Sequence, residues 1–134
     1  MWIYRLSRGR VANRAVGSMP ILLLTAAGRR SGKRRTVPLC YMPDGEHLVV
    51  VGSRGGHIRH PDWALNLREH REATVEIGGA TLEVRAAWTE GAERERLWEQ
   101  VTTRYPFYGG YARAAEREIP VVRLTPVGVL SGEC

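Results

Sequence analysis

Two strand-like segments joined by a pair of glycines limit most strongly how this chain can fold. Residues 73–77 and 80–88 alternate apolar and polar side chains with a period of two, and only Gly78 and Gly79 separate them. A two-residue glycine turn between such segments is typical of a β-hairpin, because glycine readily adopts the positive φ angles that the turn requires. The pattern therefore predicts antiparallel strand pairing rather than a sheet built from alternating strands and helices.

The remaining segments predict the order of the elements. Four further runs rich in aliphatic and β-branched residues predict strands: 21–25, 36–41, 47–52 and 119–124. Three segments with helical spacing predict helices: 62–70, 90–104 and 107–117. The Asp44-Gly45 step predicts a tight turn within residues 42–46, and Thr89 is a candidate cap for the helix that follows it. This order is typical of an α+β fold, in which a mostly antiparallel sheet curls into a small barrel with flanking helices.

Residues 1–18 differ from the rest of the chain, because they combine scattered arginines with helical propensity that is broken at Gly9 and Gly17. We expect a basic helical arm over residues 1–18 and a single barrel domain over residues 19–134, which is long enough to bury a core of its own. The arm has four alternative roles: packing on the barrel, covering a site, contacting another subunit, or lying on a membrane surface.

Cysteine content and hydropathy bear on the cellular compartment. The two cysteines, Cys40 and Cys134, have the spacing of neither a disulfide framework nor a metal site, which favours a reducing compartment. No apolar run approaches the roughly 20 residues of a membrane helix, and the N-terminal residues lack the apolar core of a signal peptide. We therefore expect a cytoplasmic protein, with membrane association through residues 1–18 as the alternative.

Positive charge is concentrated in the first third of the chain. Nine of the 20 Lys and Arg residues lie in residues 1–43, whereas all 14 acidic residues lie in residues 44–134, and the net charge is +6. This asymmetry implies an anionic partner: a phosphorylated ligand, a nucleic acid or an acidic membrane. Five of the cations fall within residues 28–35, the basic loop, beside two glycines that let backbone N–H groups approach a ligand. The loop suits a polyanion, and the alternative is a solvated hairpin tip.

Several familiar chemistries lack their motifs. The basic loop differs from a nucleotide-binding P-loop, because three residues rather than four separate Gly28 from Gly32, and Arg34 stands where a hydroxyl would bind magnesium. The sequence contains neither a Gly-x-Gly-x-x-Gly motif nor a Gly-x-Ser-x-Gly elbow. His57 and His60 have no cysteine or carboxylate cluster beside them, so we expect no metal site. The classes of function that remain are chemistry that depends on a cofactor and ligand binding without catalysis.

Six groups of residues occur in one order over residues 21–126. They are Leu24-Thr25; Gly28–Gly32 with Arg35, Thr36 and Pro38; Gly52–Gly56; His60–Trp63 with Asn66-Leu67; Tyr105-Pro106 with Tyr108 and Tyr111; and Ile119–Val122. Each group is short, but together, in this order and spacing, they resemble the deazaflavin-dependent nitroreductase family, whose members are reductases that use coenzyme F-420. The resemblance covers nearly the whole chain.

The resemblance implies a split β-barrel of the FMN-binding type, with the phosphate and oligoglutamate tail of reduced coenzyme F-420 against the basic loop. Residues that match the family's coenzyme site are Arg29, Arg30, Ser31, Lys33, Arg35, Thr36, Pro38, Ser53, Arg54, Gly55, Gly56, Trp63 and Asn66. This expectation agrees with the chemistry of the loop, since guanidinium groups bind phosphates and carboxylates in a two-point geometry.

The resemblance also implies an activity: transfer of a hydride from the deazaflavin to a conjugated acceptor such as a quinone, an enone or a nitroaromatic. Tyr108, Tyr111 and Ser53 match the hydrogen-bonding groups that we expect to be catalytic, and the proton comes from a tyrosine or from water. Residues expected to line the substrate pocket are Cys40, Tyr105, Tyr108 and Tyr111. Cys40 stands where many members of the family have an aromatic residue that lines the pocket, so the resemblance leaves the identity of the acceptor open.

Two alternatives stand beside this hypothesis. The first is a reductase of the same fold that uses FMN, whose shorter anionic tail needs fewer cations. The second is a basic barrel without enzymatic activity that binds nucleic acid or a membrane. We expect no nucleic-acid partner, because the aromatic residues cluster at 105–111 rather than interleave with the basic loop. The sequence leaves both a monomer and a homodimer open.

Overall fold

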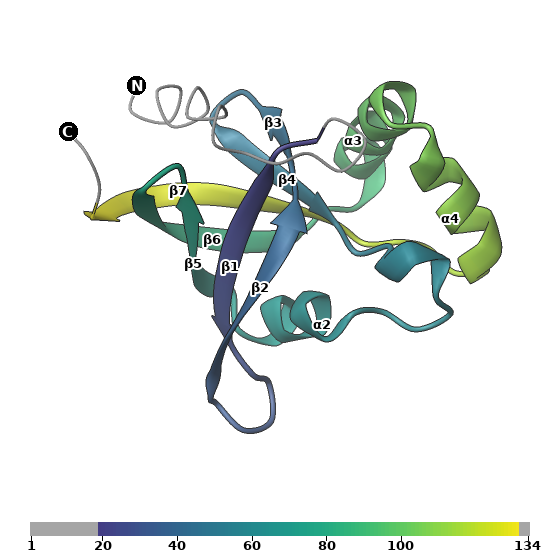
Figure 1. The fold of residues 1–134 in the computed structure, drawn as a ribbon. Helices are drawn as coiled ribbons and strands as arrows, with labels where there is room; N and C mark the ends of the chain where they lie inside the picture. Colours follow the sequence, from purple (N-terminus) through teal and green to yellow (C-terminus); the bar gives the residue numbers. More distant parts are fainter. Residues whose placement is uncertain (1–18, 132–134) are drawn as a thin grey trace.

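The computed structural model describes residues 19–131, which form one sheet with flanking helices (Figure 1). The strands are β1 (Ile21–Ala27), β2 (Arg34–Cys40), β3 (Met42–Asp44), β4 (His47–Val51), β5 (Glu72–Ile77), β6 (Ala80–Trp88) and β7 (Val121–Ser131). The helices are the single 3₁₀ turn η2 (Arg54–Gly56), α2 (Asp62–Glu69), α3 (Gly91–Arg104) and α4 (Phe107–Ala115). The predicted basic arm over residues 1–18 lies outside the described residues, so the division of the chain at residue 18 stays a prediction.

The sheet has the strand order β2-β1-β5-β6-β7-β4-β3, and every neighbouring pair is antiparallel. Figure 1 shows it curled, with the basic loop projecting where β1 turns into β2, and with α2 close to that end. The Gly78-Gly79 turn joins β5 to β6 as predicted, since Ile77 pairs directly with Ala80 and both glycines have positive φ angles. The predicted α+β architecture of antiparallel strands is confirmed.

Two apolar cores occupy opposite faces of the sheet. The first lies inside the curl and joins alternate residues of the strands, such as Leu22, Val75 and Leu82, to Leu67 of α2. The second lies under α3 and α4 and contains Leu97 and Val101 of α3. Strand β4 contributes alternate residues to both cores, which explains its continuous run of apolar residues.

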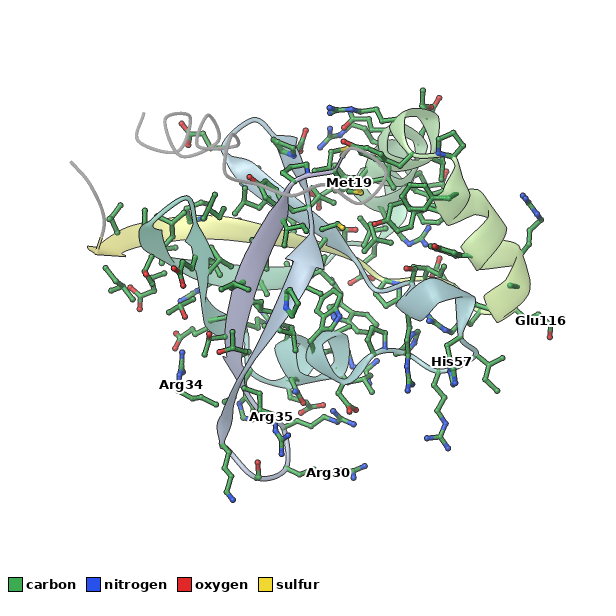
Figure 2. All side chains as sticks on the ribbon, viewed as in Figure 1. Met19, Arg30, Arg34, Arg35, His57 and Glu116 are labelled. Atoms are coloured by element: carbon green, nitrogen blue, oxygen red, sulfur yellow. The ribbon has the colours of Figure 1, made fainter. Side chains whose placement is uncertain are left out.

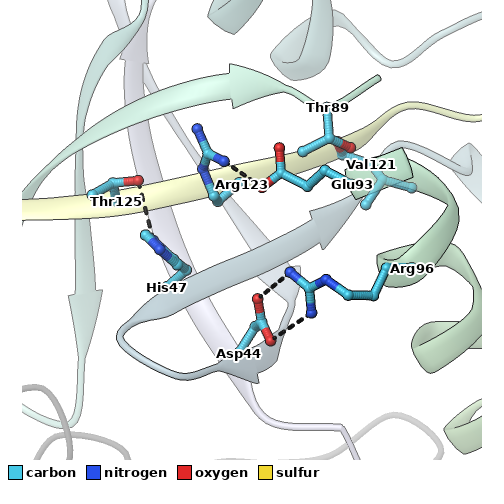
Figure 3. Close-up of polar contacts among 8 residues, drawn as sticks. All are labelled: Asp44, His47, Thr89, Glu93, Arg96, Val121, Arg123 and Thr125. Carbon is cyan, nitrogen blue, oxygen red and sulfur yellow. Dashed lines mark hydrogen bonds and ion pairs between the residues drawn. The ribbon is translucent and has the colours of Figure 1, made fainter. Parts of the chain in front are cut away.

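Polar contacts attach α3 to the edge of the sheet that β3, β4 and β7 form (Figure 3). The guanidinium of Arg96 donates to both carboxylate oxygens of Asp44, at 3.4 and 3.3 Å. Arg123 of β7 pairs with Glu93 of α3. These contacts orient the helix, while burial of its apolar stripe supplies most of the stabilisation, because ion pairs at the surface contribute little.

Three predicted details of the fold are wrong. Residues 42–44 form the short strand β3 rather than part of a turn, and β7 continues to Ser131 rather than ending at residue 124. Pro43 is tolerated in β3 because β3 is an edge strand, and Pro126 lies beyond the last residue of β7 that pairs with β4. Thr89 does not cap α3, because its hydroxyl donates to the carbonyl of Val121 at 2.7 Å.

None of the helices within residues 19–131 is long and apolar enough to span a membrane.

The two faces of β1 give a matched pair of substitutions. Leu22 is 1% exposed in the first core, whereas its neighbour Leu23 points away from that core and is 38% exposed. We expect Leu22→Ala to lower the free energy of unfolding by about 2–5 kcal/mol and Leu23→Ala to lower it by about 1 kcal/mol or less. Urea denaturation measures both, and an equal loss in the two variants would contradict the assigned inward face of β1.

Candidate functional site

A groove runs between the basic loop and the first two turns of α2. Its outer part is a cavity of about 280 Å³ lined by Gly28, Arg29, Arg30, Ser31, Arg35, Asp62 and Asn66. Its inner part is a cavity of about 210 Å³ lined by Leu24, Ala26, Arg35, Val37, Asp62, Trp63 and Asn66. Because the two cavities share Arg35, Asp62 and Asn66, they adjoin, and we call them together the basic groove. The groove is cationic at the loop and apolar toward the sheet.

Asn66 attaches the basic loop to α2. Its side-chain oxygen accepts hydrogen bonds from the backbone N–H of Arg29 at 3.0 Å and from the guanidinium of Arg29 at 2.8 Å. A second nitrogen of the same guanidinium lies 3.4 Å from a carboxylate oxygen of Asp62. Arg29 was predicted to meet an anionic ligand, but here its guanidinium holds the loop against the helix. Asn66 is 7% exposed, so the amide that anchors the loop is largely removed from water.

Four cations of the basic loop have no acidic partner. Arg30, Lys33, Arg34 and Arg35 are exposed, and none of them forms an ion pair with an acidic residue of the described part of the chain. Arg35 lines both parts of the groove. Figure 2 shows the labelled arginines 30, 34 and 35 at the end of the molecule where the loop projects. This arrangement concentrates positive charge without neutralising it, as a site for a polyanion requires.

Strand alternation separates the predicted residues of β2 into two sets. Arg35 and Val37 face the basic groove, so their neighbours Arg34 and Thr36 lie on the opposite face of the strand. The Thr36 hydroxyl is hydrogen-bonded to that of Thr25 at 2.7 Å. Like Thr36, Pro38 lies on the opposite face, so the structure does not bring Thr36 and Pro38 into the groove with Arg35. Their contact with a coenzyme stays a prediction.

The second predicted segment, residues 52–60, wraps around a residue that the sequence reasoning missed. The guanidinium of Arg117 donates to four carbonyl oxygens and one imidazole nitrogen. The acceptors are the carbonyls of Gly52 (3.2 Å), Ser53 (3.1 Å), His57 (3.0 Å) and Arg59 (3.0 Å), and Nδ1 of His60 (2.8 Å). No local pattern marks an isolated arginine after a helix as the centre of a loop that begins 65 residues earlier.

The backbone of η2 forms a concave donor site. Ser53 has right-handed helical angles (φ −78°, ψ −30°), whereas Arg54 has φ +48°. Consecutive residues of opposite hand direct their N–H groups toward one point, which is the arrangement called an anion-binding nest. Gly56 is required for packing: a Cβ atom there would lie 3.2 Å from the Cβ of Ala114 and 3.4 Å from the backbone of Tyr111. The segment is thus held against α4.

The predicted substrate-pocket residues gather in the second core. Tyr105 and Tyr108 are 7% and 6% exposed, and Tyr111 and Cys40 are half-buried against the same core. The rings of Tyr108 and Tyr111 meet edge to face, with their centroids 5.9 Å apart. The structure therefore brings these four residues together, but on the α4 side of residues 52–60 rather than in the basic groove. Their roles in catalysis and substrate binding stay predictions.

Burial fixes the protonation state of Tyr108. Removal from water, with smaller contributions from Cys40, Tyr111 and Tyr105, raises the pKa of its phenol well above the usual value of 10.0. The phenol therefore stays protonated at neutral pH and acts as a hydrogen-bond donor. Its present acceptor is the sulfur of Met19 at 3.4 Å, a weak acceptor that a carbonyl oxygen would outcompete.

His60 connects residues 52–60 to α2. Its ring meets the ring of Trp88 edge to face, with the centroids 5.4 Å apart, and the indole N–H of Trp88 donates to the carbonyl of Ala64 at 2.9 Å. A guanidinium only donates hydrogen bonds, so the Nδ1 atom that faces Arg117 must be unprotonated. Burial, followed by the positive charges of Arg117 and Arg68, lowers the pKa of His60. The neutral imidazole is therefore the form that holds the loop.

Comparison with known proteins gives consistent matches. A family model described as F420H(2)-dependent quinone reductase matches residues 1–126. The F420H(2)-dependent quinone reductase Rv1261c of Mycobacterium tuberculosis (strain ATCC 25618 / H37Rv) is 34% identical over 126 residues, covering 92% of this chain and 85% of the relative.

Two solved structures also match. One, described as an F420-H2 dependent reductase (FDR-A), superposes with a TM-score of 0.70 at 34% identity and covers 78% of this chain and 93% of its own. Another, described as a domain-swapped dimer, has a TM-score of 0.70 at 30% identity and covers 92% and 96% of the two chains. These matches confirm the resemblance stated from the sequence and the split-barrel fold that it implied.

The neutral state of His60 predicts a pH dependence of stability. Because the folded-state pKa is lower than the unfolded value of about 6.5, the contribution of His60 is fully present above that pH and is lost as pH falls through the lowered pKa. His60→Asn keeps an acceptor near Nδ1 that does not titrate.

We expect the unfolding free energy of wild type to fall more steeply than that of His60→Asn between pH 6.5 and pH 5. His70→Asn, at an exposed histidine that ends α2, is the control and should follow wild type. Parallel curves for wild type and His60→Asn in urea titrations would show that His60 is not the titrating group.

Proposed function

Since the chain belongs to the F420H(2)-dependent quinone reductase family and its coenzyme is F-420, we propose that the basic groove holds the anionic tail of that coenzyme and that the acceptor is a quinone. The first proposal is supported by two exposed arginines, Arg30 and Arg35, that line the groove and form no ion pair with an acidic residue of the described part of the chain. The second proposal, a quinone acceptor, is supported by the description "F420H(2)-dependent quinone reductase", which the family model and the Mycobacterium tuberculosis relative share.

The residues of the groove fit the chemistry of the tail. A phosphate and several carboxylates need several cations, and the arginines offer planar pairs of donors that match either group. Asp62 is the one acidic residue that lines the groove, and the guanidinium of Arg29 lies beside it. The groove therefore has cations to spare after its own carboxylate is paired. FMN, which carries a single phosphate, leaves most of this charge without a partner.

Residues 52–60 supply the second part of the proposed coenzyme site. The nest at Ser53 and Arg54 presents backbone N–H groups, and the Ser53 side chain, 7% exposed, offers a hydroxyl beside them. Trp63 and Asn66 form the wall of α2 that lies along the groove. Reduced coenzyme F-420 supplies a hydride from C5 of its deazaflavin ring when bound. The protein contributes binding and orientation of the ring, and exclusion of water from it.

Tyr108 and Tyr111 are proposed to orient the acceptor. The raised pKa of Tyr108 keeps its phenol protonated, so that it can donate to a quinone carbonyl as negative charge develops on that oxygen. Tyr111 is less buried and is the partner of Tyr108 that a ligand reaches first from solvent. Proton delivery to the reduced acceptor comes from one of these phenols or from water that they hold.

A homodimer is the oligomeric state that we propose, because a solved relative of 30% identity is described as a domain-swapped dimer. Light scattering on the purified protein distinguishes it from a monomer.

The coenzyme assignment is tested by fluorescence titration of the purified protein with oxidised coenzyme F-420, with FMN titrated in parallel. We expect saturable binding of F-420 at micromolar concentrations and weaker binding of FMN. Oxidation of the reduced coenzyme should then depend on added benzoquinone. Tight FMN binding without F-420 binding would contradict the proposal, and turnover with a nitroaromatic but with no quinone would contradict the acceptor.

Two neighbouring arginines on opposite faces of β2 test the groove itself. We expect Arg35→Ala to weaken F-420 binding by about 10- to 100-fold, since a hydrogen bond to a charged group contributes about 1.5–3 kcal/mol. Arg34→Ala removes the same charge from the face that points away from the groove and should change the Kd by about threefold or less. Equal losses in the two variants would mean that net charge, rather than the basic groove, binds the coenzyme.

A further inference from the structure

Arg117 is a guanidinium surrounded by neutral acceptors. It reaches five of them in residues 52–60, yet it forms no ion pair with a carboxylate anywhere in residues 19–131. Burial and the neighbouring charge of Arg54 both lower its pKa, which means that the protein holds this cation against desolvation and repulsion. A role in simple charge pairing is therefore excluded within the described part of the chain, and the hydrogen bonds themselves are what the residue provides.

The backbone after α4 directs Arg117 toward residues 52–60. Helix α4 ends at Ala115, and the next residue, Glu116, has left-handed angles (φ +56°, ψ +35°) although it is not glycine. This conformation costs a residue with a Cβ atom about 1 kcal/mol or more. The helical backbone therefore stops before Arg117, whose guanidinium reaches residues 52–60. Figure 2 shows the labelled Glu116 and His57 at the same end of the molecule, where α4 approaches η2.

The hydrogen bonds of Arg117 determine which way the peptide groups of η2 face. In a planar trans peptide the C=O and N–H groups point in opposite directions, and the described residues contain no cis peptide. The carbonyls of Gly52 and Ser53 face Arg117, so the N–H groups of Ser53 and Arg54, which belong to the same two peptides, face away from it. Within residues 19–131 neither N–H group has a hydrogen-bond acceptor.

We propose that Arg117 is a positioning residue for the coenzyme site: it holds residues 52–60 so that the N–H groups of Ser53 and Arg54 face an oxygen of the bound coenzyme, which Arg117 itself does not touch. The proposal rests on the proposed function for the assignment of this nest to coenzyme F-420. A lysine cannot replace Arg117, because an ammonium has three donors on one atom and cannot reach five acceptors spread over nine residues.

The test compares Arg117→Lys and Arg117→Ala with Arg113→Ala, which removes an exposed guanidinium from α4 itself. We expect the Kd for F-420 to rise about tenfold or more in both Arg117 variants. The coenzyme KM should rise in parallel, whereas kcat at saturating coenzyme stays within about threefold, because the reacting groups are unchanged. Arg113→Ala should bind as wild type does. Unchanged affinity in a folded Arg117→Lys protein would overturn the proposal.

Two further readouts separate positioning from a merely structural role. Amide hydrogen exchange in Arg117→Lys should accelerate in residues 52–60 and not in the β-sheet, and millimolar methylguanidinium should restore part of the F-420 affinity of Arg117→Ala while methylammonium does not. Faster exchange throughout the sheet together with no rescue would overturn the proposal. If wild type itself fails to bind F-420, the proposed function fails, and the exchange of residues 52–60 still tests whether Arg117 controls them.

Discussion

The arrangement of the basic groove and of residues 52–60 depends on one constraint, the repulsion between like charges. Several arginines converge on the basic groove and on residues 52–60, and the chain holds the two structural ones, Arg29 and Arg117, mainly with neutral acceptors. The acceptors of Arg117 are backbone carbonyls and a neutral imidazole, which add no negative charge. The guanidinium of Arg29 is held by the amide oxygen of Asn66 at 2.8 Å and, at 3.4 Å, by the single carboxylate of Asp62. As a result, the positive field at Arg30, Lys33 and Arg35 is left for a ligand.

Helix α2 joins the parts of the candidate site, although it has only eight residues. Three pairs with i, i+4 spacing point in three directions: Asp62 and Asn66, Trp63 and Leu67, and Ala64 and Arg68. The first pair holds Arg29 of the basic loop, and the second packs on the first core. The third contacts Trp88, whose ring also meets His60. One short helix therefore sets the basic loop and residues 52–60 at fixed positions relative to the sheet.

Local patterns in the sequence predicted those features of the fold that depend only on residues close together in the sequence. The Gly78-Gly79 hairpin, the basic loop and the helix after Pro61 follow from turn geometry, charge and spacing, and the structure has each of them. Because side chains alternate along a strand, Arg35 could also have been separated from Thr36 and Pro38 on the sequence alone. The family motif includes all three residues and does not distinguish the two faces of the strand. Arg117 could not be found in this way, because its partners lie about 60 residues earlier and are backbone carbonyls, which every residue has.

We propose that the basic groove recognises the charged tail of the coenzyme rather than its deazaflavin ring. The most direct measurement compares the affinity of the protein for coenzyme F-420 with its affinity for the same deazaflavin lacking the phosphate and glutamates, in wild type and in Arg35→Ala. We expect removal of the tail to weaken binding by about tenfold or more in wild type and by clearly less in Arg35→Ala, since the two changes remove the same interaction. Equal affinities for the two ligands in wild type would contradict it.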